Sequence, residues 1–156
     1  MRILGIDCGT ERTGYGVIES DGKRHRAVAF GVIKTNPRAP MADRLCVIAA
    51  GLRAVIVEHA PEETVIEEVF LARNSQSALK LAQVRGVAMV VARETPMEVH
   101  EVSAREVKMA VVGYGNAEKG QVQVMVRALL GLEETPAEDA ADALAGAICR
   151  ATMRRQ

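Results

Sequence analysis

Two apolar runs in this chain each lead to a carboxylate, and this repeated pattern constrains the fold more than any other feature. The first run covers residues 3–6 and is followed by Asp7, and the second lies in the β-rich segment 64–70 and leads to Glu67. Runs of this length predict buried strands. A charge at the end of a buried strand is costly unless it is paired, solvated or bound to metal. A strand-end acid can also simply cap the following turn, so a metal site is a hypothesis that needs further ligands.

Hydrophobic periodicity and turn signals place further elements around these two runs. Predicted strands cover residues 3–6, 13–19, about 25–35, 64–70 and 96–102. Predicted helices cover residues 41–59, 75–93, a short segment from 103, about 117–130, and 135 to about 151. The short connections between the first strands predict an antiparallel meander, and the later strand, helix, strand order predicts a parallel right-handed crossover. We expect an α/β fold with a mixed five-stranded sheet in a single domain of residues 1–156.

Local signals predict where several helices begin. Ser75 is a candidate N-cap, Ser103 with Glu106 forms a predicted capping box, and a second such box opens at Thr135. The helix over residues 75–93 is apolar on more than one face. One face should meet the sheet, and the surplus could pack against a second subunit; the alternative is a wholly buried helix.

Composition excludes some classes of protein. The 20 basic and 20 acidic residues give a net charge of zero, so no global basic excess indicates nucleic-acid binding. No acid lies between Glu68 and Glu94, however, and the four cations in that interval form either a local positive face or a solvated helix surface.

We expect a cytoplasmic protein without membrane segments, because neither a long apolar run nor a signal-peptide layout is present. Three distant cysteines predict reduced thiols.

Two further carboxylates lie on the last predicted helix. Asp139 and Asp142 are three residues apart on one face, among small residues suited to close packing on a sheet. An acid at a helix N-terminus is also favoured by the helix dipole alone. Together with Asp7 and Glu67, however, they form a set of hard oxygen ligands that suits Mg²⁺ or Mn²⁺. Two such ions can activate water for phosphodiester cleavage.

The order of motifs resembles the ribonuclease H-like fold and, within it, the bacterial RuvC family of Holliday junction resolvases. The resemblance covers nearly the whole chain. The motifs that carry it are Gly5-Ile6-Asp7-x-Gly9, Thr13-Gly14-Tyr15-Gly16-Val17, Ile66-Glu67-Glu68-Val69-Phe70, Asn74 to Val87, Val107-Lys108, Gly115 to Val122, and Asp139-Ala140-Ala141-Asp142-Ala143-Leu144-Ala145. The resemblance implies a mixed sheet with helices on both faces.

The resemblance also implies roles for individual residues. It makes Asp7, Glu67, Asp139 and Asp142 catalytic metal ligands, and it adds Lys119 as a catalytic residue. The residues that it implies in DNA binding are Phe70, Arg73, Asn74, Lys80, Arg85, Lys108 and Lys119. Two departures are Cys8, where proline is usual, and Glu11, where a basic or neutral residue is common. Cys8 places a thiol beside the metal site that could respond to oxidation.

The implied function is a metal-dependent endonuclease for four-way DNA junctions in recombination and repair. It would make paired symmetric nicks with 5′-phosphate and 3′-hydroxyl ends. Two cuts need two sites, which predicts a homodimer, and the resemblance implies cooperation with a branch-migration helicase complex.

Three alternatives are open at this stage. Residues 5–10 also resemble the first phosphate loop of actin-like ATPases and sugar kinases, although those proteins need a second domain. A ribonuclease H-like nuclease acting on RNA or RNA–DNA hybrids, and a catalytically silent junction-binding protein, are the others.

Overall fold

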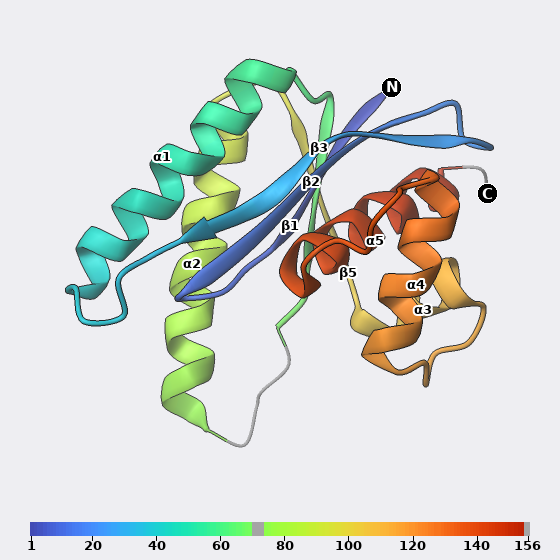
Figure 1. Ribbon diagram of the computed structural model, residues 1–156. Helices are drawn as coiled ribbons and strands as arrows, with labels where there is room; N and C mark the ends of the chain where they lie inside the picture. The colour runs from blue at the N-terminus through green and yellow to red at the C-terminus, as the bar shows by residue number, and fades with distance from the viewer. Residues whose placement is uncertain (70–73, 155–156) are drawn as a thin grey trace.

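A five-stranded sheet with the order β3-β2-β1-β4-β5 organises the molecule (Figure 1). The computed structural model describes residues 1–69 and 74–154, with the backbone alone at Lys119. The strands are β1 (Arg2–Asp7), β2 (Arg12–Ser20), β3 (His25–Lys34), β4 (Glu63–Glu67) and β5 (Glu98–Val102). β1 to β3 are antiparallel neighbours, whereas β4 is parallel to both β1 and β5. The predicted mixed sheet is therefore confirmed, and β1 is its central strand.

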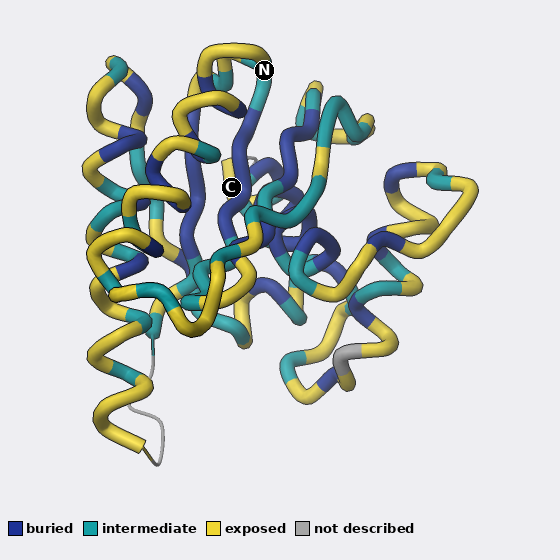
Figure 2. Tube along the Cα trace, turned by 60° about the vertical axis from the view of Figure 1, so that its left-hand side comes forward, coloured by how far each residue is buried: buried dark blue, intermediate teal, exposed yellow. Residues whose placement is uncertain are grey.

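Helices cover both faces of this sheet, as predicted (Figure 1). One face carries α1 (Met41–His59) and α2 (Ser75–Arg93), and the other carries α3 (Ala104–Val112), α4 (Lys119–Leu130) and α5 (Glu138–Met153). Strand residues alternate between the two layers: Leu4 and Ile66 pack in the α1–α2 core, while Ile3 and Val65 pack in the α5 core. Figure 2 shows these strands as the buried centre of the molecule. Among the described residues, no helix is long and apolar enough to cross a membrane.

Helix α5 lies directly on β1 and β2 because glycines on the strands face its backbone. A Cβ atom on Gly14 would lie 2.0 Å from the carbonyl oxygen of Asp139, and one on Gly5 would lie 1.9 Å from that of Ala143. The alanines of α5 are buried in this contact. The predicted small-residue packing surface is thus confirmed, and it fixes the backbone of Asp139 against the sheet.

Helix α2 has an exposed apolar outer face, so the alternative of a wholly buried helix is wrong. Leu79 is 66% exposed and Val90 is 63% exposed, whereas Val84 and Ala88 face the core. Between α1 and α2 lies an apolar groove of about 700 Å³. A bidentate ion pair from Arg53 on α1 to Glu94, with N–O distances of 2.7 and 2.8 Å, holds the two helices together at this groove.

Local sequence signals predict one helix start correctly and place another one residue too late. The capping box at Ser103 is confirmed: its hydroxyl accepts a hydrogen bond from the Glu106 amide at 3.2 Å, and its own amide donates to the Glu106 carboxylate at 2.7 Å. The N-cap of α2, in contrast, is Asn74 rather than Ser75, because the Asn74 side-chain oxygen accepts the Gln76 amide at 3.0 Å.

The capping box predicted at Thr135 is wrong. Helix α5 begins at Glu138, because Ala137 has φ −54° and ψ 148°, and that ψ lies outside the helical range. The predicted start at Ala117 is also too early. Helix α4 begins at Lys119, after the extended residue Glu118, whose amide donates to the Gln121 side chain at 2.9 Å.

Candidate metal centre

The four carboxylates predicted as metal ligands line one cavity of about 240 Å³. Asp7 is the last residue of β1 and Glu67 is the last residue of β4. These strands are parallel neighbours, so both acids leave the same edge of the sheet. Asp139 and Asp142 enter from the first turns of α5, three residues apart and on one face of the helix. The fold therefore brings together acids from both halves of the chain.

The turn that follows Asp7 is held by side chains from two other elements. The hydroxyl of Thr13, which is buried in β2, donates to the carbonyl oxygen of Gly9 at 2.8 Å. The buried Arg44 of α1 donates to the carbonyl oxygen of Thr10 at 2.7 Å. These contacts fix the β1–β2 turn, and with it the position of Asp7 at the cavity.

Negative charge dominates the cavity. Glu138 also lines it, and Lys108 of α3 contributes a cation. Glu138 and Asp139 lie in the first turn of α5, where the helix dipole favours carboxylates. The described lining contains neither histidine nor cysteine, and a set of carboxylate oxygens suits a hard divalent cation. The donor chemistry of the residues present thus fits a divalent metal.

One carboxylate of the set is also ion-paired. The Nε of Arg12, at the start of β2, donates to Oδ2 of Asp139 at 2.7 Å. The Arg12 side chain is 46% exposed and that of Asp139 is 27% exposed, so the pair lies at the rim of the site.

Cys8 faces a second cavity of about 220 Å³ that shares Asp7 and Glu67 with the first. Burial, with the nearby charges of Asp7 and Glu67, raises the pKa of the Cys8 thiol to about 12, and Arg85 partly offsets this. The thiol is therefore protonated at neutral pH. Because the thiolate is the reactive form, this environment disfavours the oxidative response that the sequence suggests.

The residues predicted to bind DNA are placed unequally. Lys108 lines the carboxylate cavity. Lys119 is the first residue of α4, so its predicted place in the first turn of a helix is confirmed. Its side chain lies outside the described part of the structure. Phe70 and Arg73 lie outside the described residues. A DNA contact by each of these residues stays a prediction.

The cations of α2 do not share one open face. Lys80 is exposed, but Arg85 donates to Glu101 of β5 at 2.7 Å, and its side chain is 16% exposed. Arg93, at the other end of the helix, donates to the carbonyl oxygen of Met97 at 2.7 Å. Asn74 is exposed at the helix start and serves as its N-cap. Among the described cations of this segment, Arg85 is paired with a carboxylate, whereas Lys80 and Arg93 are exposed, five and eight residues away from it along the helix.

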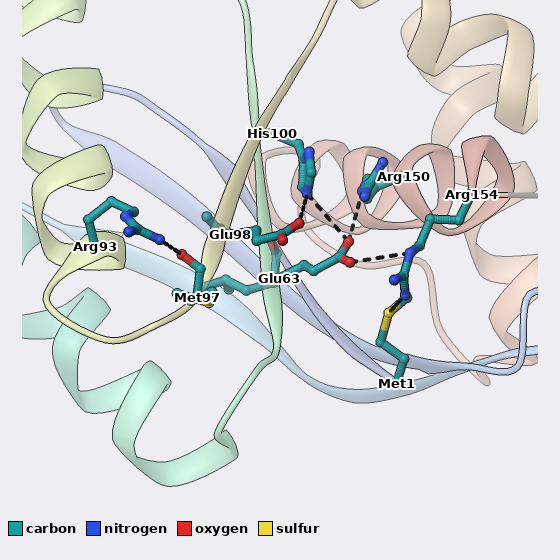
Figure 3. A network of polar contacts seen from close by, with 10 residues as sticks. Met1, Glu63, Arg93, Met97, Glu98, His100, Arg150 and Arg154 are labelled. Carbon is teal, nitrogen blue, oxygen red and sulfur yellow. Dashed lines mark hydrogen bonds and ion pairs between the residues drawn. The ribbon is translucent and has the colours of Figure 1, made fainter.

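A separate polar network lies at the opposite end of β4 (Figure 3). The buried Glu63 carboxylate is paired with Arg150 at 2.8 Å and Arg154 at 3.3 Å, and His100 lies 3.6 Å from it. Glu63, Glu98 and His100 have ligand atoms within 4.8 Å of one another. Because two arginines already balance Glu63, the network acts as an anchor between β4 and the end of α5.

Sequence reasoning missed two residues of the site, Glu138 and Arg12. A signal existed for Glu138, since it precedes Asp139 and lies four residues before Asp142 on the same helix. No local signal existed for Arg12, because 127 positions separate it from Asp139. Its place depends on how α5 packs on β2.

The strand order, the two helical layers and the carboxylate cavity define a nuclease of the ribonuclease H-like class. Residues 3–150 match the family Crossover junction endodeoxyribonuclease RuvC, and the chain belongs to this family.

Relatives and solved structures agree with this assignment. The chain is 55% identical over 151 residues to the crossover junction endodeoxyribonuclease RuvC of Syntrophotalea carbinolica, covering 97% of this chain and 94% of that protein. It is 53% identical to that of Marinobacter nauticus, covering 98% and 87%. The structure of T. thermophilus RuvC in complex with Holliday junction substrate has a TM-score of 0.94 and 36% identity, covering 99% of this chain and 95% of that one.

Proposed function

We propose that this chain is an endonuclease that resolves four-way DNA junctions by paired symmetric nicks, leaving 5′-phosphate and 3′-hydroxyl ends. The observation that carries the proposal is the convergence of Asp7, Glu67, Asp139 and Asp142 on one cavity. It is supported by the 0.94 TM-score to a RuvC bound to junction DNA. Recombination and repair in the cytoplasm, with a branch-migration helicase complex as partner, belong to the same proposal through the family resemblance.

The four carboxylates would hold Mg²⁺, with Mn²⁺ able to substitute, and we propose two ions in each site. Oxygen ligands alone and a cavity of about 240 Å³ support this choice. If these carboxylates held divalent cations, the site would gain activation of the attacking water and neutralisation of charge on the leaving oxygen.

The protein's own contribution is rigid placement of charge. Asp7 ends a central strand, and Asp139 is fixed through the contact of its backbone with Gly14, so both carboxylates keep their positions before the substrate arrives. Preorganised charge of this kind avoids reorganisation during the reaction. Lys108, which lines the cavity, would bind a non-bridging oxygen of the scissile phosphate, and Lys119 is proposed for the same phosphate from the start of α4.

We propose that the enzyme works as a homodimer, because one chain supplies one site and a junction needs two cuts. The apolar groove between α1 and α2, with the exposed Leu79 and Val90 beside it, offers the surface for a second copy. DNA recognition is proposed to involve Phe70, Arg73, Asn74 and Lys80 as well as the two lysines, with Arg85 supporting this region through its pair with Glu101.

Cleavage of labelled four-way junction, linear duplex and RNA–DNA hybrid, each with Mg²⁺, Mn²⁺ or EDTA, tests the proposed function. We expect selective cutting of the junction with either metal and none with EDTA. Faster cutting of linear duplex would contradict junction selectivity. Faster cutting of the hybrid would instead favour the ribonuclease H-like alternative.

A further inference from the structure

Arg12 is a cation built against one of the proposed metal ligands. Its Nε donates to Oδ2 of Asp139 at 2.7 Å, across a sequence separation of 127 residues. Arg12 opens β2 and pairs in register with Lys34 of β3, so its backbone is fixed while its side chain is 46% exposed. The guanidinium therefore binds one carboxylate oxygen of Asp139, and its exposure leaves space for it to move away.

Arg12 is not needed to place Asp139. The carbonyl oxygen of Asp139 lies against Gly14, where a Cβ would come within 2.0 Å of it, and α5 is packed on the sheet by its buried alanines. Backbone packing thus sets the position of this ligand. What the Arg12 side chain adds is mainly a positive charge beside a cavity lined by acids.

We propose that Arg12 is an internal counter-cation that competes with the divalent metal for Asp139; this inference rests on the proposed metal centre. In the metal-free protein Arg12 offsets repulsion among the clustered carboxylates. Metal binding must then break the Arg12–Asp139 pair or tolerate a nearby like charge. A unit positive charge about 6 Å from a divalent cation weakens binding of that cation about tenfold even at the dielectric constant of water.

Titration of the purified, metal-free protein with Mn²⁺, followed by the electron paramagnetic resonance signal of free Mn²⁺ and without DNA, tests the proposal. We expect Arg12→Gln to bind Mn²⁺ about tenfold more tightly than the wild type. Arg12→Lys keeps the charge and should stay within about threefold of the wild type. The matched control is Arg26→Gln, which breaks an exposed ion pair between Arg26 of β3 and Glu19 of β2, neither of which lines the cavity, and it should leave affinity unchanged.

Three results would overturn the proposal. Equal Mn²⁺ affinity in Arg12→Gln and wild type would show that the charge does not compete. Weaker binding in Arg12→Gln would show that Arg12 supports Asp139 as a ligand. Absence of Mn²⁺ binding to the wild type would overturn the metal centre itself, which separates failure of the proposed function from failure of the Arg12 inference.

Discussion

Adjacent glutamates at the end of β4 have different surroundings, although their chemistry is the same. Glu67 lines the carboxylate cavity with Asp7, whereas Glu68 is exposed and lies at the second cavity. Strand alternation predicts this division, because successive side chains leave opposite faces of a sheet. Glu67 is thus a candidate metal ligand, whereas Glu68 does not line the carboxylate cavity.

This difference gives a matched pair of variants. Glu67→Gln removes the charge of a proposed metal ligand and should lower the rate of junction cleavage at least about a hundredfold. Glu68→Gln makes the same chemical change beside it and should stay within about threefold. Single-turnover cleavage with Mg²⁺ measures both, and equal losses in the two variants would argue against the assignment of Glu67.

At the scale of elements, the contact of α5 with the sheet determines where two of the four acids lie. Glycines in β1 and β2 let the backbone of α5 touch the strands, so Asp139 and Asp142 are positioned by packing. The same contact brings Asp139 to Arg12. Element packing, rather than loop conformation, therefore builds this half of the site.

Substitution at this contact should be costly. Gly14→Ala places a Cβ against the Asp139 carbonyl oxygen and should lower the free energy of unfolding by about 1–3 kcal/mol or more. Gly146→Ala, in α5 itself, meets its nearest neighbour at 3.8 Å and should raise stability by about 0.5–1 kcal/mol. Urea denaturation compares the two, and a harmless Gly14→Ala would mean that the helix does not rest on the strand as described.

The start of α2 provides a second element-scale prediction. Asn74→Ala removes the acceptor for the Gln76 amide and should cost about 1 kcal/mol of stability. Ser75→Ala, one residue later, should change little because Ser75 already lies inside the helix. Chemical denaturation of both variants decides which residue is the N-cap. A larger loss of stability in Ser75→Ala than in Asn74→Ala would favour Ser75, as the sequence predicted.

Strand-end positions and helical spacing indicated the four carboxylates that line one cavity, because strand alternation and helix periodicity are local properties, while their role as metal ligands stays a prediction. Helix boundaries were less predictable. The Thr135 signal has the spacing of a capping box, yet Ala137 stays extended and α5 begins at Glu138. The Arg12–Asp139 pair could not be predicted, since it arises from packing between segments 127 residues apart.

At the scale of the whole molecule, the two faces of the sheet carry different surface features. The α5 layer and the strand ends build the carboxylate cavity, whereas the α1–α2 layer leaves an apolar groove at the surface. A proposed dimer through this groove would leave both cavities accessible to a junction.

A charge placed in the groove should separate the two copies. Val90→Glu introduces a carboxylate on an exposed residue that lines the groove, and it should weaken dimerisation roughly a hundredfold. Val124→Glu makes the same change on α4, where Val124 is 61% exposed, and should leave assembly intact. Sedimentation equilibrium measures the association, and a dimeric Val90→Glu protein would place the interface elsewhere.

We propose that the acids around Asp7 perform metal-dependent cleavage of four-way junctions. Single-turnover cleavage and equilibrium binding of one labelled junction, measured in parallel for wild type and Asp7→Asn with Mg²⁺, test it most directly. We predict that Asp7→Asn cuts at less than about 1% of the wild-type rate while binding the junction with nearly unchanged affinity. Cleavage by Asp7→Asn at the wild-type rate would contradict the assignment of the metal centre.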